Sequence, residues 1–122
     1  MNHQALSIRT FIGASDFKES RAFYTALGFE EAVISGDLSL FRVNKDLAFY
    51  LQNYFLEAWN HNSMIFLEVK DIHQHWADLQ ALHLPARFPT VRVSAIKNDS
   101  WGKEYFVHDP SGVLWHFGSF NG

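Results

Sequence analysis

Residues 101–120, WGKEYFVHDPSGVLWHFGSF, constrain the fold more than any other stretch, because they have the pattern of a complete β-hairpin. Residues 103–108 are rich in aromatic and β-branched side chains, and residues 113–120 form a second run of this kind. Between them lies Asp109-Pro110-Ser111-Gly112. Proline presets φ at the first central position of a turn, and glycine accepts the positive φ that strains residues with a Cβ atom. The sequence therefore predicts two antiparallel strands joined by a tight turn.

The first half of the chain predicts the element order β-α-β-β-β. The helix is expected to begin at Ser15 or Asp16, either of which can cap it, and to end at Gly28. The polar segment 53–62 is expected to link the two halves, with a short helical turn around Leu56. The predicted strands are residues 6–13, 29–34, 39–43 and 47–52.

The second half repeats this pattern. Asp71 is expected to cap a helix that Leu84-Pro85 ends. The predicted strands are residues 64–69, 90–96, 104–108 and 113–119. Because each half alone is too small to close a stable core, the repeat indicates a duplication within one domain spanning residues 1–122. The two βαβββ halves are expected at about residues 5–53 and 63–120.

The string GKEYFVHDPSGVLWHF resembles the closing hairpin of the glyoxalase, bleomycin-resistance and dioxygenase group, also called the vicinal-oxygen-chelate superfamily. It is most similar to the bleomycin-resistance branch, and SDFKESRAFYTALGF resembles the first helix of the group. The resemblance implies an α+β fold in which two tandem βαβββ modules form a curled mixed β-sheet around a cavity, with the helices outside. It also implies a homodimer, because half-cavities in this group are commonly completed across a two-fold axis.

Composition excludes several classes of protein. The formal charge of -3, from 10 Lys and Arg against 13 Asp and Glu, provides no basic patch for nucleic acid. Without cysteine, the chain can form neither a disulfide, nor a thiolate metal site, nor a cysteine nucleophile. No apolar run approaches the roughly 20 residues that a membrane span needs. We expect a soluble, cytoplasmic protein with no nucleic-acid or membrane partner.

The resemblance also indicates where metal-binding members of the group carry their ligands. These positions, on the first, fourth, fifth and last strands, fall on Arg9, Tyr50, Met64 and His116. A guanidinium repels a divalent ion, and phenol and thioether groups are poor ligands for the metals involved. We therefore expect no metal and no other cofactor, which disfavours metal-dependent activity.

Strand alternation assigns side chains to the expected cavity. Arg9, Tyr50 and His116 are expected to form a polar floor, although His116 can equally be an interior histidine with a hydrogen-bond partner. Aromatic side chains are expected to form the walls. The candidate ligand-binding residues are Arg9, Phe11, Tyr50, Met64, Phe66, Glu68, Trp101, Tyr105 and His116.

The favoured function is a metal-free protein that sequesters an aromatic or amphipathic small molecule. The resemblance supports it, since the bleomycin-resistance branch binds cationic glycopeptide antibiotics and so gives resistance. The alternative is a lyase-, isomerase- or dioxygenase-type enzyme. It requires metal on a set such as Glu68 and His116, or acid–base work by His116, Tyr50 and Glu68 with Arg9 holding an anionic substrate. A third reading is a scaffold whose own aromatic side chains fill the cavity.

Overall fold

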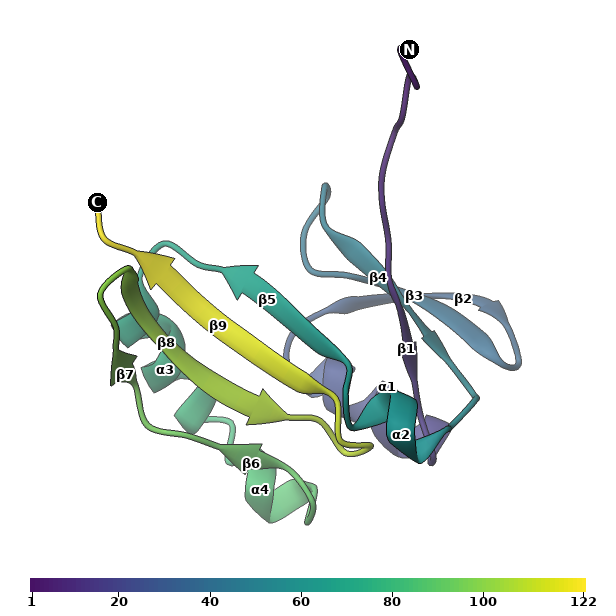
Figure 1. The fold of residues 1–122 in the computed structure, drawn as a ribbon. Helices are drawn as coiled ribbons and strands as arrows, with labels where there is room; N and C mark the ends of the chain where they lie inside the picture. Colours follow the sequence, from purple (N-terminus) through teal and green to yellow (C-terminus); the bar gives the residue numbers. More distant parts are fainter.

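A computed structural model describes residues 1–122 and shows two mixed β-sheets, one from each half of the chain (Figure 1). The helix α1 (Phe17–Ala26) connects the first two strands of the first sheet. The strands of this sheet lie in the order β1 (Phe11–Gly13), β4 (Ala48–Gln52), β3 (Leu38–Arg42) and β2 (Glu30–Ser35). The predicted β-α-β-β-β order of the first half is confirmed.

The second sheet has five strands and the same plan. Its path is β5 (Met64–Glu68), β9 (Leu114–Phe120), β8 (Gly102–His108) and β6 (Arg92–Val93), and β7 (Lys97–Asn98) also pairs with β8. The helices of this half are α3 (Ile72–Gln80) and the short α4 (Leu84–Arg87), while α2 (Glu57–Asn60) lies in the linker. In each sheet the first strand runs parallel to the last, β1 to β4 and β5 to β9, as expected for a duplicated module.

Capping side chains fix where the two long helices begin. The carboxylate of Asp16 accepts a hydrogen bond from the backbone N–H of Glu19 at 3.0 Å, and Asp71 accepts one from Gln74 at 3.1 Å. Each bond satisfies a backbone donor that the first helical turn leaves without a partner. Gly28 then takes a φ of +91° just beyond α1. Both predicted caps and the predicted end of α1 are confirmed.

The first strand is shorter than predicted, because the sheet has no partner for its beginning. It starts at Phe11 rather than at residue 6, and residues 1–10 are exposed. Thr10 still accepts a backbone hydrogen bond from Tyr50 at 3.0 Å, and the residues before Arg9 extend away from the sheet (Figure 1). Phe11 lies opposite Tyr50, and β4 begins only two residues earlier, at Ala48. No residue of β4 therefore lies opposite the segment before Arg9. We call residues 1–10 the N-terminal arm.

The predicted strand over residues 90–96 is wrong in its bounds, because only Arg92–Val93 forms a strand there and β7 lies beyond it, at Lys97–Asn98. After β6, the hydroxyl group of Ser94 accepts a 2.8 Å hydrogen bond from the backbone N–H of Phe106. The indole of Trp76 donates to the backbone carbonyl of Ser94 at 3.0 Å. The backbone N–H of Ser94 still donates to the carbonyl of Phe106 at 3.0 Å, but side chains take the other partners at this point, and strand pairing resumes only at β7. The prediction that Leu84-Pro85 ends a helix is also wrong. Pro85 lies in the first turn of α4, because the N–H group that proline lacks would have no partner within a first helical turn.

One hydrophobic core joins the two modules. The ring of Tyr24, from the first module, lies 5.0 Å from that of Phe49 and 5.8 Å from that of Trp115, from the second module. The rings of Phe49 and Trp115 lie 5.4 Å apart. All three are at most 3% exposed, so neither module closes its core without the other. No helix in the structure combines the length and the apolar character that a membrane span requires.

Candidate functional site

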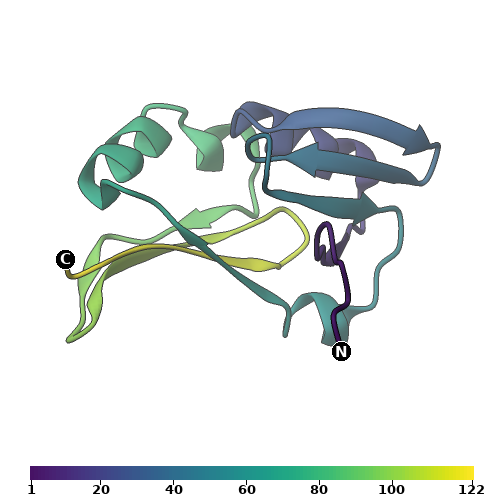
Figure 2. The same ribbon diagram turned by 90° about the horizontal axis from the view of Figure 1, so that it is seen from above.

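The second sheet has one face packed under α3 and one face over which no helix lies (Figure 2). His75 of α3 lies against the rings of Tyr105 and Phe117 on the first of these faces. Strand alternation directs the intervening residues to the opposite side. We call this side the uncovered face; it consists of Met64, Phe66 and Glu68 of β5, Arg92 of β6, Glu104, Phe106 and His108 of β8, and Leu114 and His116 of β9.

His116 lies between two aromatic rings at the centre of the uncovered face. Phe66 and Phe106 are its neighbours on the adjacent strands. The ring of Phe66 lies 6.5 Å away at an interplanar angle of 29°, and that of Phe106 lies 4.9 Å away at 87°. The strand register therefore builds a site with an imidazole flanked by phenyl rings.

Glu104 holds this imidazole from one side. Its Oε1 lies 2.9 Å from Nδ1 of His116, and the two side chains are 12% and 21% exposed. The other ring nitrogen, Nε2, lies 3.4 Å from Sδ of Met64. His116 thus has a hydrogen-bond partner, as expected of an interior histidine, and it also lies on an accessible face, as expected of a ligand-binding residue. Glu104 was not predicted, although its alternation with Phe106 and His108 along β8 indicates the same face.

An aromatic cluster lies next to this imidazole. The ring of Phe66 lies 5.9 Å from that of Trp101 and 5.8 Å from that of Phe120, and the last two are 5.1 Å apart. Gly118 makes room for it, because a Cβ atom there would come within 2.7 Å of Cζ of Phe66. Phe66 is 44% exposed and Phe120 is 55% exposed. The cluster therefore offers open aromatic surface, which is suited to a flat apolar molecule.

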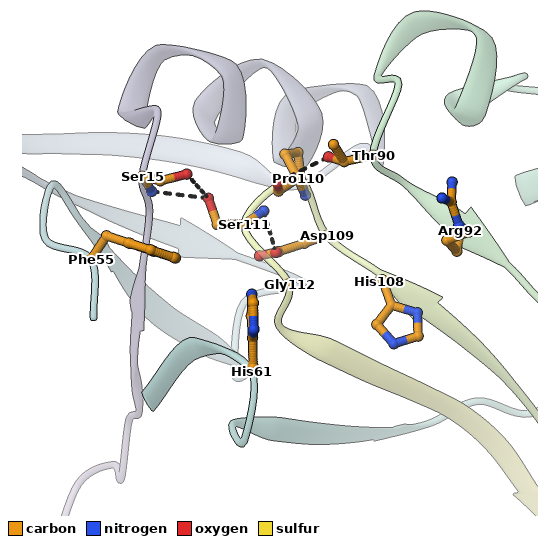
Figure 3. A pocket seen from close by; sticks show the side chains of 10 residues that line it. All are labelled: Ser15, Phe55, His61, Thr90, Arg92, His108, Asp109, Pro110, Ser111 and Gly112. Atoms are coloured by element: carbon orange, nitrogen blue, oxygen red, sulfur yellow. Dashed lines mark hydrogen bonds between the residues drawn. The ribbon is translucent and has the colours of Figure 1, made fainter. Parts of the chain in front are cut away.

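The uncovered face continues as a groove toward the turn between β8 and β9. Three hollows of 330, 470 and 560 Å³ all have His108 in their walls. The smallest also contains His116, and the largest contains Arg92, His61 and the turn itself (Figure 3). The groove thus passes from the imidazole of His116 to a more polar end with basic side chains.

The floor of that polar end is a buried carboxylate. Asp109 is 1% exposed and accepts hydrogen bonds from the hydroxyl group of Tyr24 at 2.6 Å and from the backbone N–H groups of Ser111 and Val113, each at 2.9 Å. Burial outweighs these bonds and raises the pKa of Asp109 to about 6. Gly112 takes a φ of +90° in this turn, which confirms the predicted turn chemistry.

Arg9, Phe11 and Tyr50 form a separate cluster on the first sheet. A nitrogen of the Arg9 guanidinium donates to the hydroxyl group of Tyr50 at 3.1 Å, and the guanidinium lies 5.7 Å from the Tyr50 ring centroid. The rings of Phe11 and Tyr50 stack at 4.8 Å and 24°. Arg9 also lines a 320 Å³ cleft together with Ile65. Arg9, Phe11 and Tyr50 thus lie together on one face of the first sheet.

Within one chain the predicted site residues therefore form two groups. Met64, Phe66, Glu68 and His116 belong to the second sheet and Trp101 directly precedes its strand β8, and no hydrogen bond, ion pair or ring contact joins them to the cluster around Arg9. Tyr105 belongs to neither group. It is fully buried on the face under α3, its hydroxyl group lies 2.6 Å from Nδ1 of His75, and burial raises its pKa. Strand alternation from Phe106 places Tyr105 there.

The residues at the family's metal positions do not fit a divalent ion. Arg9 and Tyr50 bond to each other, and Met64 lies beside His116 on the other sheet. Nowhere in the chain do three or more His, Asp or Glu side chains gather closely enough to hold a metal. A permanent cation and a thioether are unsuited to the hard or borderline metals of this group.

The sequence matches no protein-family model and no curated protein. Solved structures share the fold. A bleomycin-binding protein from Streptomyces verticillus, complexed with copper(II)-bleomycin, is 20% identical over 97% of this chain and 98% of its own, with a TM-score of 0.79. A glyoxalase/bleomycin resistance protein from Catenulispora acidiphila is 18% identical over 96% and 100%, with a TM-score of 0.74. TnmS3, an antibiotic binding protein from Streptomyces sp. CB03234, is 21% identical over 98% and 100%, with a TM-score of 0.71. The chain therefore has the fold of the glyoxalase/bleomycin resistance proteins, as its closing hairpin and first helix predict.

Proposed function

We propose that the protein binds a small aromatic or amphipathic molecule on the uncovered face of its second sheet, without a metal. The observation that carries this proposal is the arrangement of Phe66, Phe106 and His116 beside the open rings of Trp101 and Phe120. Such a site supplies apolar area together with a single polar anchor, which is the common design of small-molecule pockets. Two structural neighbours, a bleomycin-binding protein and an antibiotic binding protein, support it, and with it a role in antibiotic resistance.

The exposure of the face argues against a scaffold without a ligand. Met64 is 65% exposed and Phe66 is 44% exposed, so the side chains of the face do not fill the space above it. Exposed apolar surface of this kind usually marks a site of interaction. A free protein that keeps these side chains in water gains stability when a ligand or a partner covers them.

We further propose that the protein is a cytoplasmic homodimer in which residues 1–122 of each copy act as one domain. Leu6 and Ile8 of the N-terminal arm are 101% and 98% exposed, and Val33 of the first sheet is 63% exposed. An extended arm that keeps apolar side chains such as Leu6 and Ile8 in water is expected to lie against a second copy. Such a dimer offers a route by which the cluster around Arg9 meets the uncovered face. The lack of cysteine agrees with a reducing compartment.

Acid–base catalysis is a second candidate, favoured by one observation. The carboxylate of Glu104 bonds Nδ1 of His116, an arrangement that in enzymes orients an imidazole as a general base. No second titratable group is hydrogen-bonded to Nε2. Binding is therefore preferred, and turnover of a bound compound detected by mass spectrometry would reverse this preference.

A thermal-shift screen tests the binding proposal. It includes bleomycin with and without copper, fosfomycin, flavonoids and glutathione conjugates. A ligand at a hundred times its dissociation constant adds about 2.7 kcal/mol, which raises the melting temperature of a domain of this size by several degrees. His116→Ala is expected to lose the shift while staying folded. If it keeps the wild-type shift for a confirmed ligand, the uncovered face is not the binding site.

Arg9→Ala tests the contribution of the first-sheet cluster. The Arg9 side chain makes one hydrogen bond, to the hydroxyl group of Tyr50. Its removal is therefore expected to leave the fold intact. We expect this variant to lose the shift as well if the second copy in a dimer brings Arg9 to the ligand, since a guanidinium is a forked donor for a polar or anionic end. A shift lost with His116→Ala and kept with Arg9→Ala would assign the ligand to the second sheet alone.

A further inference from the structure

We propose that Glu104 fixes His116 as a hydrogen-bond acceptor, so that the site selects ligands that carry a hydrogen-bond donor, such as a phenol or an amide N–H, at the edge of a flat aromatic group. This inference rests on the proposed binding function and names the chemical class of its ligand. The two ring nitrogens of His116 have different surroundings, a carboxylate oxygen at Nδ1 and a thioether sulfur at Nε2.

Glu104 determines which ring nitrogen of His116 carries the proton. An ionised carboxylate accepts hydrogen bonds and cannot donate one. At 2.9 Å from Oε1 of Glu104, Nδ1 of His116 must therefore carry a hydrogen. A neutral imidazole has only one N–H group, so Nε2 is left with its lone pair. The pair is 12% and 21% exposed, which shields this bond from competing water.

Nε2 of His116 has no hydrogen-bond donor beside it in the protein. The only polar atom of the chain near it is Sδ of Met64, at 3.4 Å, and a thioether sulfur has no hydrogen to donate. The lone pair of Nε2 therefore has no donor within the protein. Met64 is 65% exposed and unbranched, so its side chain can move aside at small cost. The free acceptor thus lies behind a movable side chain on an accessible surface.

The aromatic rings around His116 favour a planar ligand. Phe66 and Phe106 flank the imidazole, and the rings of Trp101 and Phe120 extend the apolar surface beyond Phe66. A planar ring placed on this surface brings a substituent at its edge to Nε2. Glu104 is itself occupied by Nδ1, so the substituent that gains most is a neutral donor.

His73 provides a matched control. It is an exposed residue of α3, on the covered side of the second sheet, and its Nε2 lies 3.2 Å from Nζ of Lys103. His73→Gln therefore removes an imidazole from the protein without altering the uncovered face or the acceptor that the proposal invokes.

The first experiment needs no ligand. Long-range ¹H–¹⁵N spectra of the free protein at about pH 8, above the ordinary titration range of imidazole, report which ring nitrogen is protonated. We expect the Nδ1–H form for His116 in the wild type and in Glu104→Gln, whose amide oxygen still accepts. In Glu104→Leu we expect the Nε2–H form. An Nε2–H form in the wild type would overturn the proposal.

The second experiment compares β-naphthol with its methyl ether, which has the same ring system but no donor. Affinities are measured by NMR chemical-shift titration. We expect the wild type and His73→Gln to bind the naphthol about tenfold more tightly than the ether, as for one hydrogen bond at the upper end of the usual range. Glu104→Leu and His116→Gln should bind both equally. Equal wild-type affinities would overturn the acceptor assignment alone, whereas binding of neither probe would overturn the proposed function with it.

Discussion

The hydroxyl group of Tyr24, in α1, donates a 2.6 Å hydrogen bond to the carboxylate of Asp109, in the turn between β8 and β9. The same oxygen accepts a 2.9 Å bond from the indole N–H of Trp115. Tyr24 is fully buried, and the other two residues are 1% exposed. Because Tyr24 belongs to the first module and its two partners to the second, this chain of bonds ties the modules together by polar contacts inside their shared core.

Removing that hydroxyl group is expected to destabilise the fold. Tyr24→Phe keeps the ring but leaves the buried indole N–H of Trp115 without an acceptor and removes one hydrogen bond from the buried carboxylate, which costs about 1–3 kcal/mol. Tyr50→Phe is the matched control, since its hydroxyl group bonds Arg9 at the surface. Its removal should cost under about 0.5 kcal/mol. Urea unfolding monitored by tryptophan fluorescence measures the free energy of unfolding of both variants. If the two substitutions lower it equally, the buried hydrogen bonds of Tyr24 contribute no more stability than the surface bond of Tyr50.

Asp109 makes stability depend on pH. Burial raises its pKa in the folded protein to about 6, above the ordinary value of an exposed carboxyl group. Between these two values the folded protein binds more protons at this site than the unfolded chain, so its contribution to the free energy of unfolding falls as the pH rises. The contribution is complete below about pH 4, lost above about pH 6, and of the order of 3 kcal/mol.

Asp109→Asn isolates this contribution, because all other titrating groups are common to both proteins. The free energy of unfolding of the wild type minus that of the variant should decrease from about pH 4 to pH 6 and stay constant above. Urea unfolding at several pH values measures this difference. A difference that increases with pH would mean that the folded protein favours the charged carboxylate, contrary to the effect of its burial.

The sequence predicts the fold well because its strongest signals are local. Asp16 and Asp71 are capping residues in front of amphipathic helices, and Gly112 closes a turn between two aromatic strands. Such signals depend on neighbours in sequence. The end of β6 before Ser94 was missed, since it depends on a bond from Phe106, twelve residues away in sequence and on another strand.

The candidate site was only partly predictable for a similar reason. Strand alternation assigns Phe66 and His116 to one face, and the register confirms that they are neighbours. Alternation alone does not reveal which residues of different strands touch. The bond between Glu104 and His116 depends on the pairing of β8 with β9, and the separation of Arg9 from both depends on how the two sheets are placed.

We expect the purified protein to contain no stoichiometric divalent ion. Arg9 and Tyr50 occupy two of the family's ligand positions and bond each other, and Met64 occupies a third. The melting temperature should therefore be the same with and without EDTA, and elemental analysis should find less than about one metal per ten chains. A bound ligand can bring its own metal, as copper(II)-bleomycin does in one structural neighbour, so the measurement uses protein that has not been exposed to a ligand. A tightly held zinc, nickel, manganese or iron would favour the enzyme over the binding protein.

The N-terminal arm is expected to hold two copies together. Leu6 and Ile8 alternate along an extended segment and are almost completely exposed, so covering both against a partner is expected to contribute about 3–5 kcal/mol for each arm. A two-fold axis counts every such contact twice.

Light scattering at micromolar concentration should therefore give twice the 14.1 kDa of one chain. Leu6→Ser combined with Ile8→Ser should give a monomer or raise the dissociation constant by at least a hundredfold, whereas Ser7→Ala, which changes a residue between them without removing apolar surface, should leave the dimer intact. A dimer that survives the double substitution unchanged would locate the interface elsewhere, and the exposed strand β2 around Val33 would then be the next surface to alter.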